Sequence, residues 1–202
     1  MITRTDFDII AAWIPEGARV LDLGCGDGAL IKYLAARKGV RGYGIENDDQ
    51  SLIECIKNNI NVIQSDLEAG LKEIADKSFD VVILSQTLQA IKHTAPVMNE
   101  MLRVGREAIV TFPNFGYWKH RLQIAVSGKM PVSDDLPYQW YDTPNVHLFT
   151  INDFEAFCRA REYRILNRRV LAGRRETTFL PNLTGTLALY RFTQGGSEIL
   201  IQ

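Results

Sequence analysis

Residues 20–28 read VLDLGCGDG, and this stretch decides which fold the rest of the chain is expected to form. A mostly apolar run, as in a buried strand, leads into three glycines spaced two apart. These are Gly24, Gly26 and Gly28. Because glycine allows backbone conformations and close approaches that a side chain would block, the loop indicates a place where backbone meets a ligand. Asp22 and Asp27 flank the loop and give that place a negative charge.

Around this loop, apolar segments of strand length alternate with segments that have the period of a helix. Helices are expected at residues 5–14, 29–37, 49–58 and 94–104. Strands are expected at residues 18–23, 42–46, 61–66, 79–85 and 107–112. Such alternation is typical of parallel strands joined by crossover helices. With two further strands near the end of the chain, it predicts an α/β fold with a mostly parallel, seven-stranded doubly wound sheet and helices on both faces.

The 202 residues are expected to form a single domain with three parts. Residues 17–112 would form the ligand-binding core. Residues 113–150 are rich in proline and aromatic residues, which suits either a lid over the ligand or a cap that buries its rings on the sheet. Residues 151–193 predict a C-terminal helix and an antiparallel pair of strands, the strands lying near 163–171 and 184–193.

Charge and composition argue against several classes of partner. The formal net charge of -1 gives no general attraction to nucleic acid or to an anionic membrane. No apolar run reaches the length of about 18 residues that could span a bilayer. The three cysteines form no CxxC pair and the three histidines lie far apart, so we expect no metal site. Without a secretory signal at its N-terminus, the protein is expected to be cytoplasmic.

The spacing of the glycines distinguishes among ligands. A dinucleotide fold has G-x-G-x-x-G and a P-loop ends in Gly-Lys-Ser/Thr, whereas this loop reads G-x-G-x-G. The flanking carboxylates would repel a pyrophosphate but suit a ligand with an ammonium and a sulfonium group. Glu46, at the end of the second strand, is placed to accept both ribose hydroxyls. Asp66, after the third strand, is placed for an adenine amino group, with a simple helix N-cap as the alternative.

These residues resemble the first three motifs of class I methyltransferases that use S-adenosylmethionine (SAM): VLDLGCGDG, Glu46 in GIEND and Asp66 in QSDL. The resemblance implies a Rossmann-like fold with SAM, or S-adenosylhomocysteine, as cofactor. It implies that the glycines approach the methionyl part and Asp22 supports it. Glu46 would hold the ribose, Asp66 with Leu67 would meet the adenine, and residues 85–86 would line the methyl-donor side. The complete expected set is Asp22, Gly24, Cys25, Gly26, Gly28, Glu46, Asn47, Asp66, Leu67, Ser85 and Gln86.

Two later segments are similar to the MetW family of bacterial methionine-biosynthesis proteins. They read FPNFGYWKHRLQ, at residues 112–123, and MPVSDDLPYQWYDTPNVHLFTINDFE, at residues 130–155. With the SAM motifs included, this resemblance runs nearly from end to end and leaves out only the residues past Phe192. It implies a methyltransferase-like fold and a protein partner, a homoserine O-acyltransferase often called MetX.

Two functions from different classes follow. The first is a SAM-binding accessory or regulatory subunit of that acyltransferase, within methionine biosynthesis. The second is a SAM-dependent methyltransferase acting on a small molecule, because positioning and exclusion of water can supply most of the catalysis of methyl transfer. The glycine spacing disfavours a dinucleotide-linked oxidoreductase, and a scaffold that has lost SAM binding stays open. The residues leave open whether the chain is an enzyme.

No residue stands out as a catalytic acid, base or nucleophile. His147, which follows the aromatic segment, is the candidate for proton transfer, with a hydrogen-bonded structural histidine as the alternative. His93 suits a helix entry. Cys25 has no histidine near it in the sequence, and its slot demands a small side chain rather than a nucleophile. The arginines between residues 159 and 175 favour a solvated face or a protein interface over nucleic acid, since no Asp/Asn-Pro-Pro-aromatic motif follows the fourth strand.

Overall fold

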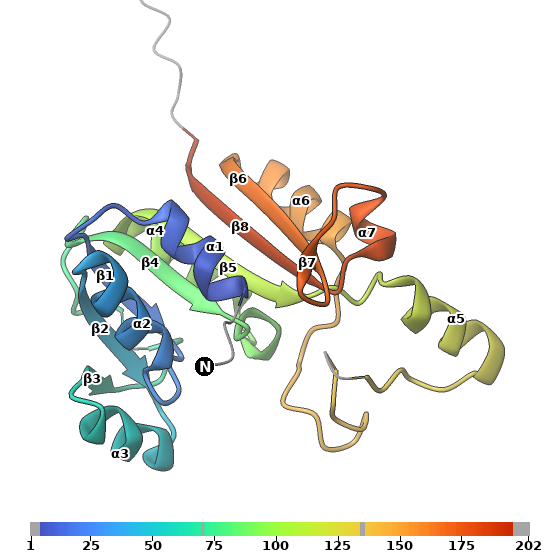
Figure 1. Ribbon diagram of the computed structural model, residues 1–202, viewed down its shortest axis with the longest axis horizontal. Helices are drawn as coiled ribbons and strands as arrows, with labels where there is room; N and C mark the ends of the chain where they lie inside the picture. Colours follow the sequence, from blue (N-terminus) through green and yellow to red (C-terminus); the bar gives the residue numbers. More distant parts are fainter. Residues whose placement is uncertain (1–4, 70, 134–135, 196–202) are drawn as a thin grey trace, which may run out of the picture.

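One mixed sheet carries the fold of the residues described by the computed structural model, 5–69, 71–133 and 136–195 (Figure 1). The described strands have the spatial order β3-β2-β1-β4-β5-β8-β6-β7. They are β1 (Arg19–Leu23), β2 (Arg41–Glu46), β3 (Asn61–Gln64), β4 (Phe79–Ser85), β5 (Gly105–Pro113), β6 (Tyr163–Ala172), β7 (Arg175–Glu176) and β8 (Leu187–Gln194). Strands β1 to β5 pair in parallel, whereas β8 runs antiparallel to both β5 and β6. The predicted mostly parallel, doubly wound α/β sheet is confirmed.

Helices cover both faces of the sheet because successive residues of the central strands serve opposite cores. The helices are α1 (Thr5–Trp13), α2 (Ala29–Lys38), α3 (Asp49–Lys57), the short 3-10 helix η1 (Leu88–Ala90), α4 (Thr94–Val104), α5 (Trp118–Ser127), α6 (Ile151–Ala160) and α7 (Pro181–Thr184). Helices α1 and α2 pack on Val81 and Ile83 of β4, and α4 and α6 share a core with Val82 and Leu84. In the described part of the chain, no helix is long and apolar enough to cross a bilayer.

The centre of the sheet contains a topological switch point. Strand β1 has β2 on one side and β4 on the other, so the chain winds outward in opposite directions from this pair. Ligands of open α/β sheets bind outside the carboxyl ends of the strands at such a point. The glycine loop follows β1 directly, and Ser85 is the last residue of β4. The fold therefore brings the loop and the end of β4 together at the expected ligand crevice.

The expected count of seven strands is wrong by one, because the described sheet has eight. After β6 the chain turns back at Gly173, whose φ of 64° lies in the left-handed region that glycine favours. Residues 175 and 176 then pair with residues 172 and 171 to form β7. A two-residue strand is too short to leave a periodic pattern in the sequence. The last strand also begins at Leu187 rather than near residue 184, because Pro181 starts the short helix α7.

Beyond β5, helix α5 and the chain that follows it stand out from the sheet (Figure 1). We call the described residues 118–133 and 136–148 the arm. The side chains of Trp140 and Tyr141 in the arm are 73% and 71% exposed. Burial against the sheet therefore does not account for these two rings.

Candidate functional site

A cavity of about 270 Å³ lies at the switch point, between the glycine loop, the end of β4 and the first residues of α1 and α2. Six of the expected cofactor residues line it: Asp22, Gly24, Cys25, Gly26, Ser85 and Gln86. Asp27 of the glycine loop also lines it, and Phe7 of α1 with Ala29 and Leu30 of α2 completes the wall. Sequence reasoning missed the three helix residues because they read as ordinary apolar positions of amphipathic helices.

The glycine loop has the conformation that its sequence requires. Gly24, Gly26 and Gly28 have φ values of 66°, 55° and 74°, all in the left-handed region. At Gly28 an added Cβ would lie 2.8 Å from Cγ1 of Ile60, so the loop packs closely there. At Gly26 an added Cβ would meet nothing within 4 Å. The backbone at Gly26 therefore borders open space, as a ligand cradle requires.

Glu46 ties the end of β2 to this loop. One carboxylate oxygen accepts a hydrogen bond from the backbone N–H of Gly26 at 2.8 Å. The other accepts from the backbone N–H groups of Asn47 and Asp48 at 2.8 and 3.0 Å. A carboxylate offers about four lone-pair positions, so these bonds leave capacity for a ribose hydroxyl. Glu46 thus fixes the loop and still presents an acceptor beside it.

Asp22 is the buried acidic residue of the site. Its side chain is only 2% exposed, and Oδ1 has no hydrogen-bond partner among the described residues. Burial in the first place, and the nearby carboxylate of Glu46 in the second, raise the pKa of Asp22 to about 8. A buried acceptor without a partner is costly, and a positively charged group would remove that cost. The residues present therefore fit a cationic ligand such as the ammonium-bearing end of SAM.

Ser85 and Gln86 close the cavity on the β4 side. The hydroxyl of Ser85 lies 3.2 Å from that of Thr111, whose hydroxyl and carbonyl oxygens each accept the backbone N–H of Gln86 at 2.9 Å. Gln86 has a φ of 54°, which is uncommon for a residue with a side chain. Its amide lies 3.5 Å from Oδ2 of Asp6 in α1. The left-handed backbone at Gln86 follows the last residue of β4 and forms part of the cavity wall.

Cys25 contributes to the cavity wall without a reactive thiol. Its Sγ points toward Sγ of Cys55, 3.8 Å away, and an added Cβ at Gly44 would lie 2.3 Å from it. Burial raises the pKa of both thiols, which keeps them protonated and poorly nucleophilic. The thiol of Cys55 also donates to the carbonyl of Gly26 at 3.1 Å. These contacts agree with a small side chain in a tight slot.

Five expected residues lie outside the lining of this cavity: Gly28, Glu46, Asn47, Asp66 and Leu67. The exposed carboxylate of Asp66 accepts the backbone N–H of Glu68 at 2.9 Å, so it caps a turn with one oxygen. Leu67 lines a different cavity of about 660 Å³ together with His93. His93 is held there by Glu68, at 2.6 Å from Nδ1, and this hydrogen bond lowers the pKa of Glu68.

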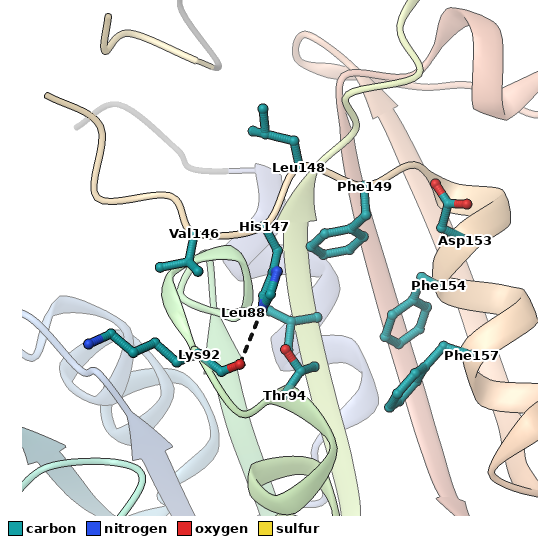
Figure 2. Close-up of a pocket in the computed structure, with 10 residues that line it drawn as sticks. All are labelled: Leu88, Lys92, Thr94, Val146, His147, Leu148, Phe149, Asp153, Phe154 and Phe157. Carbon is teal, nitrogen blue, oxygen red and sulfur yellow. Dashed lines mark hydrogen bonds between the residues drawn. The ribbon is translucent and has the colours of Figure 1, made fainter. Parts of the chain in front are cut away.

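His147 borders a second cavity, of about 470 Å³, that Figure 2 shows. Its Nε2 lies 3.2 Å from the carbonyl oxygen of Lys92, and its backbone N–H donates to the carbonyl of Gln89 at 3.0 Å. The rings of Phe149, Phe154 and Phe157 line the same cavity. His147 is absent from the lining of the glycine-loop cavity.

The arginine-rich stretch is partly neutralised by acids. Arg168 pairs with Glu155 at 2.8 Å and Arg169 with Glu176 at 3.2 Å. The guanidinium of Arg161 lies over the ring of Phe157. These local pairs reduce the positive field that the arginine count alone would suggest.

The fold and the site together define a Rossmann-like methyltransferase fold. A SAM-dependent methyltransferase from Mesorhizobium loti matches with a TM-score of 0.68 at 17% identity, over 94% of this chain and 97% of that one. A protein of the same class from Listeria monocytogenes matches with a TM-score of 0.68 at 16% identity, over 95% and 97% of the two chains. More particularly, the model of the family "Methionine biosynthesis protein MetW" matches residues 4–192, and this chain belongs to that family.

A curated relative is the bifunctional methionine biosynthesis protein MetXA/MetW of Rhodopirellula baltica. It is 39% identical over 159 residues, which cover 74% of this chain but only 26% of the relative. The chain therefore spans about a quarter of that longer polypeptide. A more distant relative, the ribosomal protein L11 methyltransferase of Wolinella succinogenes, is 31% identical over 98 residues, 48% of this chain and 35% of that protein.

Proposed function

We propose that this MetW-family chain binds SAM and acts as an accessory, regulatory subunit of a cytoplasmic homoserine O-acyltransferase in methionine biosynthesis. The observation that carries the proposal is the fused relative, whose name joins MetXA to MetW in one polypeptide. Parts that occur fused in one organism are candidates to associate as separate chains in another. SAM is made from methionine, so a subunit that binds SAM would report the level of the end product to the enzyme at the pathway's entry.

The glycine-loop cavity supplies the sensor in this proposal. Asp22 offers a buried carboxylate to a cationic group, and Gly26 leaves the space that the ligand needs. Glu46 would accept the ribose hydroxyls while it keeps the loop in place. SAM carries a methyl group on a sulfonium, but sensing needs only that the ligand bind the free and the complexed chain unequally. By linkage, the affinity for the partner then changes by the same factor.

Two measurements on the purified chain test the proposal. Calorimetry should give a dissociation constant for SAM or S-adenosylhomocysteine in the micromolar range, about −8 kcal/mol, and no binding of NAD. Size-exclusion chromatography with the homoserine O-acyltransferase of the same organism should give a co-eluting complex. A chain that binds SAM but never co-elutes with the acyltransferase would contradict the regulatory role.

The second candidate is a SAM-dependent methyltransferase for a small molecule. The second cavity favours the methyltransferase candidate. Its wall includes Leu88 of η1, which is only two residues beyond Gln86 in the wall of the glycine-loop cavity. An acceptor could lie there, with His147 at its edge for proton transfer. The test is conversion of SAM to S-adenosylhomocysteine with a cell extract of small molecules as acceptor source. Turnover without any complex with the acyltransferase would support this candidate instead.

A further inference from the structure

The arm leaves large apolar side chains in solvent. Trp140 and Tyr141 are 73% and 71% exposed, and their rings meet edge to face with centroids 5.7 Å apart. Val146 and Leu148, at the foot of the arm, are 51% and 45% exposed. Exposed apolar side chains scattered singly are ordinary, but a gathered group marks a protein contact or a ligand groove.

Two recesses adjoin in this region. One, of about 340 Å³, has Met130, Tyr138, Trp140, Val146 and Leu148 among its lining residues. The other is the second cavity, of about 470 Å³, which Val146 and Leu148 also border. Figure 2 shows aromatic rings on one side of this second cavity and His147 on the other. Exposed rings beside apolar recesses are the arrangement in which interface anchor residues concentrate.

The stretch of the arm that carries the exposed rings is poor in charge, whereas Lys92 and Asp153 line the second cavity and charged residues lie earlier in the arm. Between residues 136 and 148 the acidic and basic side chains are limited to Asp142 and His147. The cores of protein interfaces are depleted in charged residues and enriched in tyrosine, tryptophan and methionine. The composition of residues 136–148 fits such a core better than it fits a solvated face.

Hydrogen bonds join residues 146–147 of the arm to residues 86–89, which begin in the wall of the glycine-loop cavity. The carbonyl of Gln89 accepts the backbone N–H groups of Val146 and His147 at 2.9 and 3.0 Å. The side-chain amide of Gln89 in turn donates to the carbonyl of Gln86 at 2.7 Å. Gln86 lines the glycine-loop cavity. The exposed surface is therefore connected to the cofactor cavity through a few direct hydrogen bonds.

We infer that the arm surface, formed by Tyr138, Trp140, Tyr141, Val146 and Leu148 with its two recesses, is where the homoserine O-acyltransferase docks. The inference rests on the proposed function. In the fused relative, the region similar to this chain makes up 26% of the polypeptide, so the remaining length stays tethered beside it at high effective concentration. A partner that is always present can cover rings that this chain leaves exposed. The recesses would receive apolar anchor side chains of the partner.

The test compares a double variant in the arm with a control variant outside it. The substituted side chains have similar exposed fractions. Trp140→Ser with Tyr141→Ser removes the two exposed rings of the arm. Phe179→Ser is the matched control, because Phe179 is 72% exposed but lies just before α7, outside the arm. Titration calorimetry with the acyltransferase should show at least about a tenfold weaker affinity for the double variant and a change within twofold for the control. SAM affinity and the melting temperature should stay those of the wild type in both.

Two results would overturn the inference while leaving the proposed function intact. The first is that the acyltransferase binds the wild type and the double variant equally. The second is that the control loses as much affinity as the double variant. A third contrary result is a dimer of the chain alone that the double variant dissociates, since the arm would then serve a second copy of this chain. If the wild type itself fails to bind the acyltransferase, the proposed function fails and the docking site falls with it.

Discussion

At the scale of single residues, the chemistry of the site depends on one carboxyl group. Asp22 ends up buried without a partner for Oδ1, and burial raises its pKa to about 8. The neutral carboxyl is therefore favoured in the folded protein. Its contribution to stability is present at low pH and is lost as pH rises from the ordinary value of 3.8 toward about 8. A cationic ligand reverses this preference, because it stabilises the carboxylate.

Binding of SAM near pH 7 should therefore release a proton from Asp22. We expect about one proton per bound SAM, measured by calorimetry in buffers of different ionisation enthalpy. Asp22→Asn should abolish the release, weaken SAM binding and reduce the loss of stability between pH 5 and 8. Asp27→Asn is the control for proton release alone: Asp27 also lines the cavity but is exposed, and asparagine can still accept the backbone N–H of Ala29 as Oδ1 of Asp27 does, so the release should remain. A buffer-independent binding enthalpy for the wild type would remove Asp22 from the ligand site.

The second prediction at this scale separates backbone strain from ligand contact. Gly26 and Gly17 have φ values of 55° and 69°, and an added Cβ meets nothing within 4 Å at either position. Valine at each should cost a similar amount of stability, about 1–2 kcal/mol, because both backbones are left-handed. Only Gly26→Val should abolish SAM binding, since its side chain would fill the cradle. Equal SAM affinities for the two variants, measured by calorimetry, would show that the cradle lies elsewhere.

At the scale of elements, the sequence predicted the strands and helices whose apolar residues follow a regular pattern. The apolar run of β4 and the amphipathic face of α4 are regular patterns, so β4 was predicted with its observed bounds, residues 79–85, and α4 with its observed end, residue 104. The two-residue β7 depends on a turn at Gly173, and η1 on a strained Gln86, and neither leaves a periodic signal. Pairing between distant segments, such as β8 with β5, is decided by tertiary contacts that no local pattern contains.

The link between η1 and the arm supports a prediction about coupling. Gln89→Leu keeps the size of the side chain but removes the amide that donates to Gln86. The backbone N–H groups of Val146 and His147 still donate to the carbonyl of residue 89. We expect SAM and the acyltransferase each to bind the variant within a few-fold of the wild type. The shift in acyltransferase affinity that SAM causes should shrink toward one, measured by titrations with and without saturating SAM. An undiminished shift would mean that the coupling takes another route.

At the scale of the whole molecule, the sequence motifs predicted where the site lies but not all of the residues that line it. The glycine loop after β1 and the residues at the end of β4 were predicted to lie in one site, because parallel strands bring their carboxyl ends to one edge of the sheet. The contribution of Phe7 and Asp6 could not be predicted, since the position of α1 over the cavity depends on packing of the whole domain. Asp66 and Leu67 lie outside the cavity lining, so their contact with an adenine stays a prediction. The sequence left open whether the aromatic segment is a lid or a buried cap, because aromatic residues usually indicate a core and their exposure depends on tertiary packing.

The most direct test of the regulatory role is the acyl-transfer rate of the homoserine O-acyltransferase, measured alone and with an equimolar amount of this chain across a SAM titration. The account predicts that the chain changes the rate and that SAM then shifts it further, with a midpoint near its calorimetric dissociation constant. A coupling of 1–3 kcal/mol would give about 5–150-fold control of partner affinity. The Gly26→Val variant should still change the rate but make it insensitive to SAM. A rate that is the same with and without the chain, at every SAM concentration, would contradict the account.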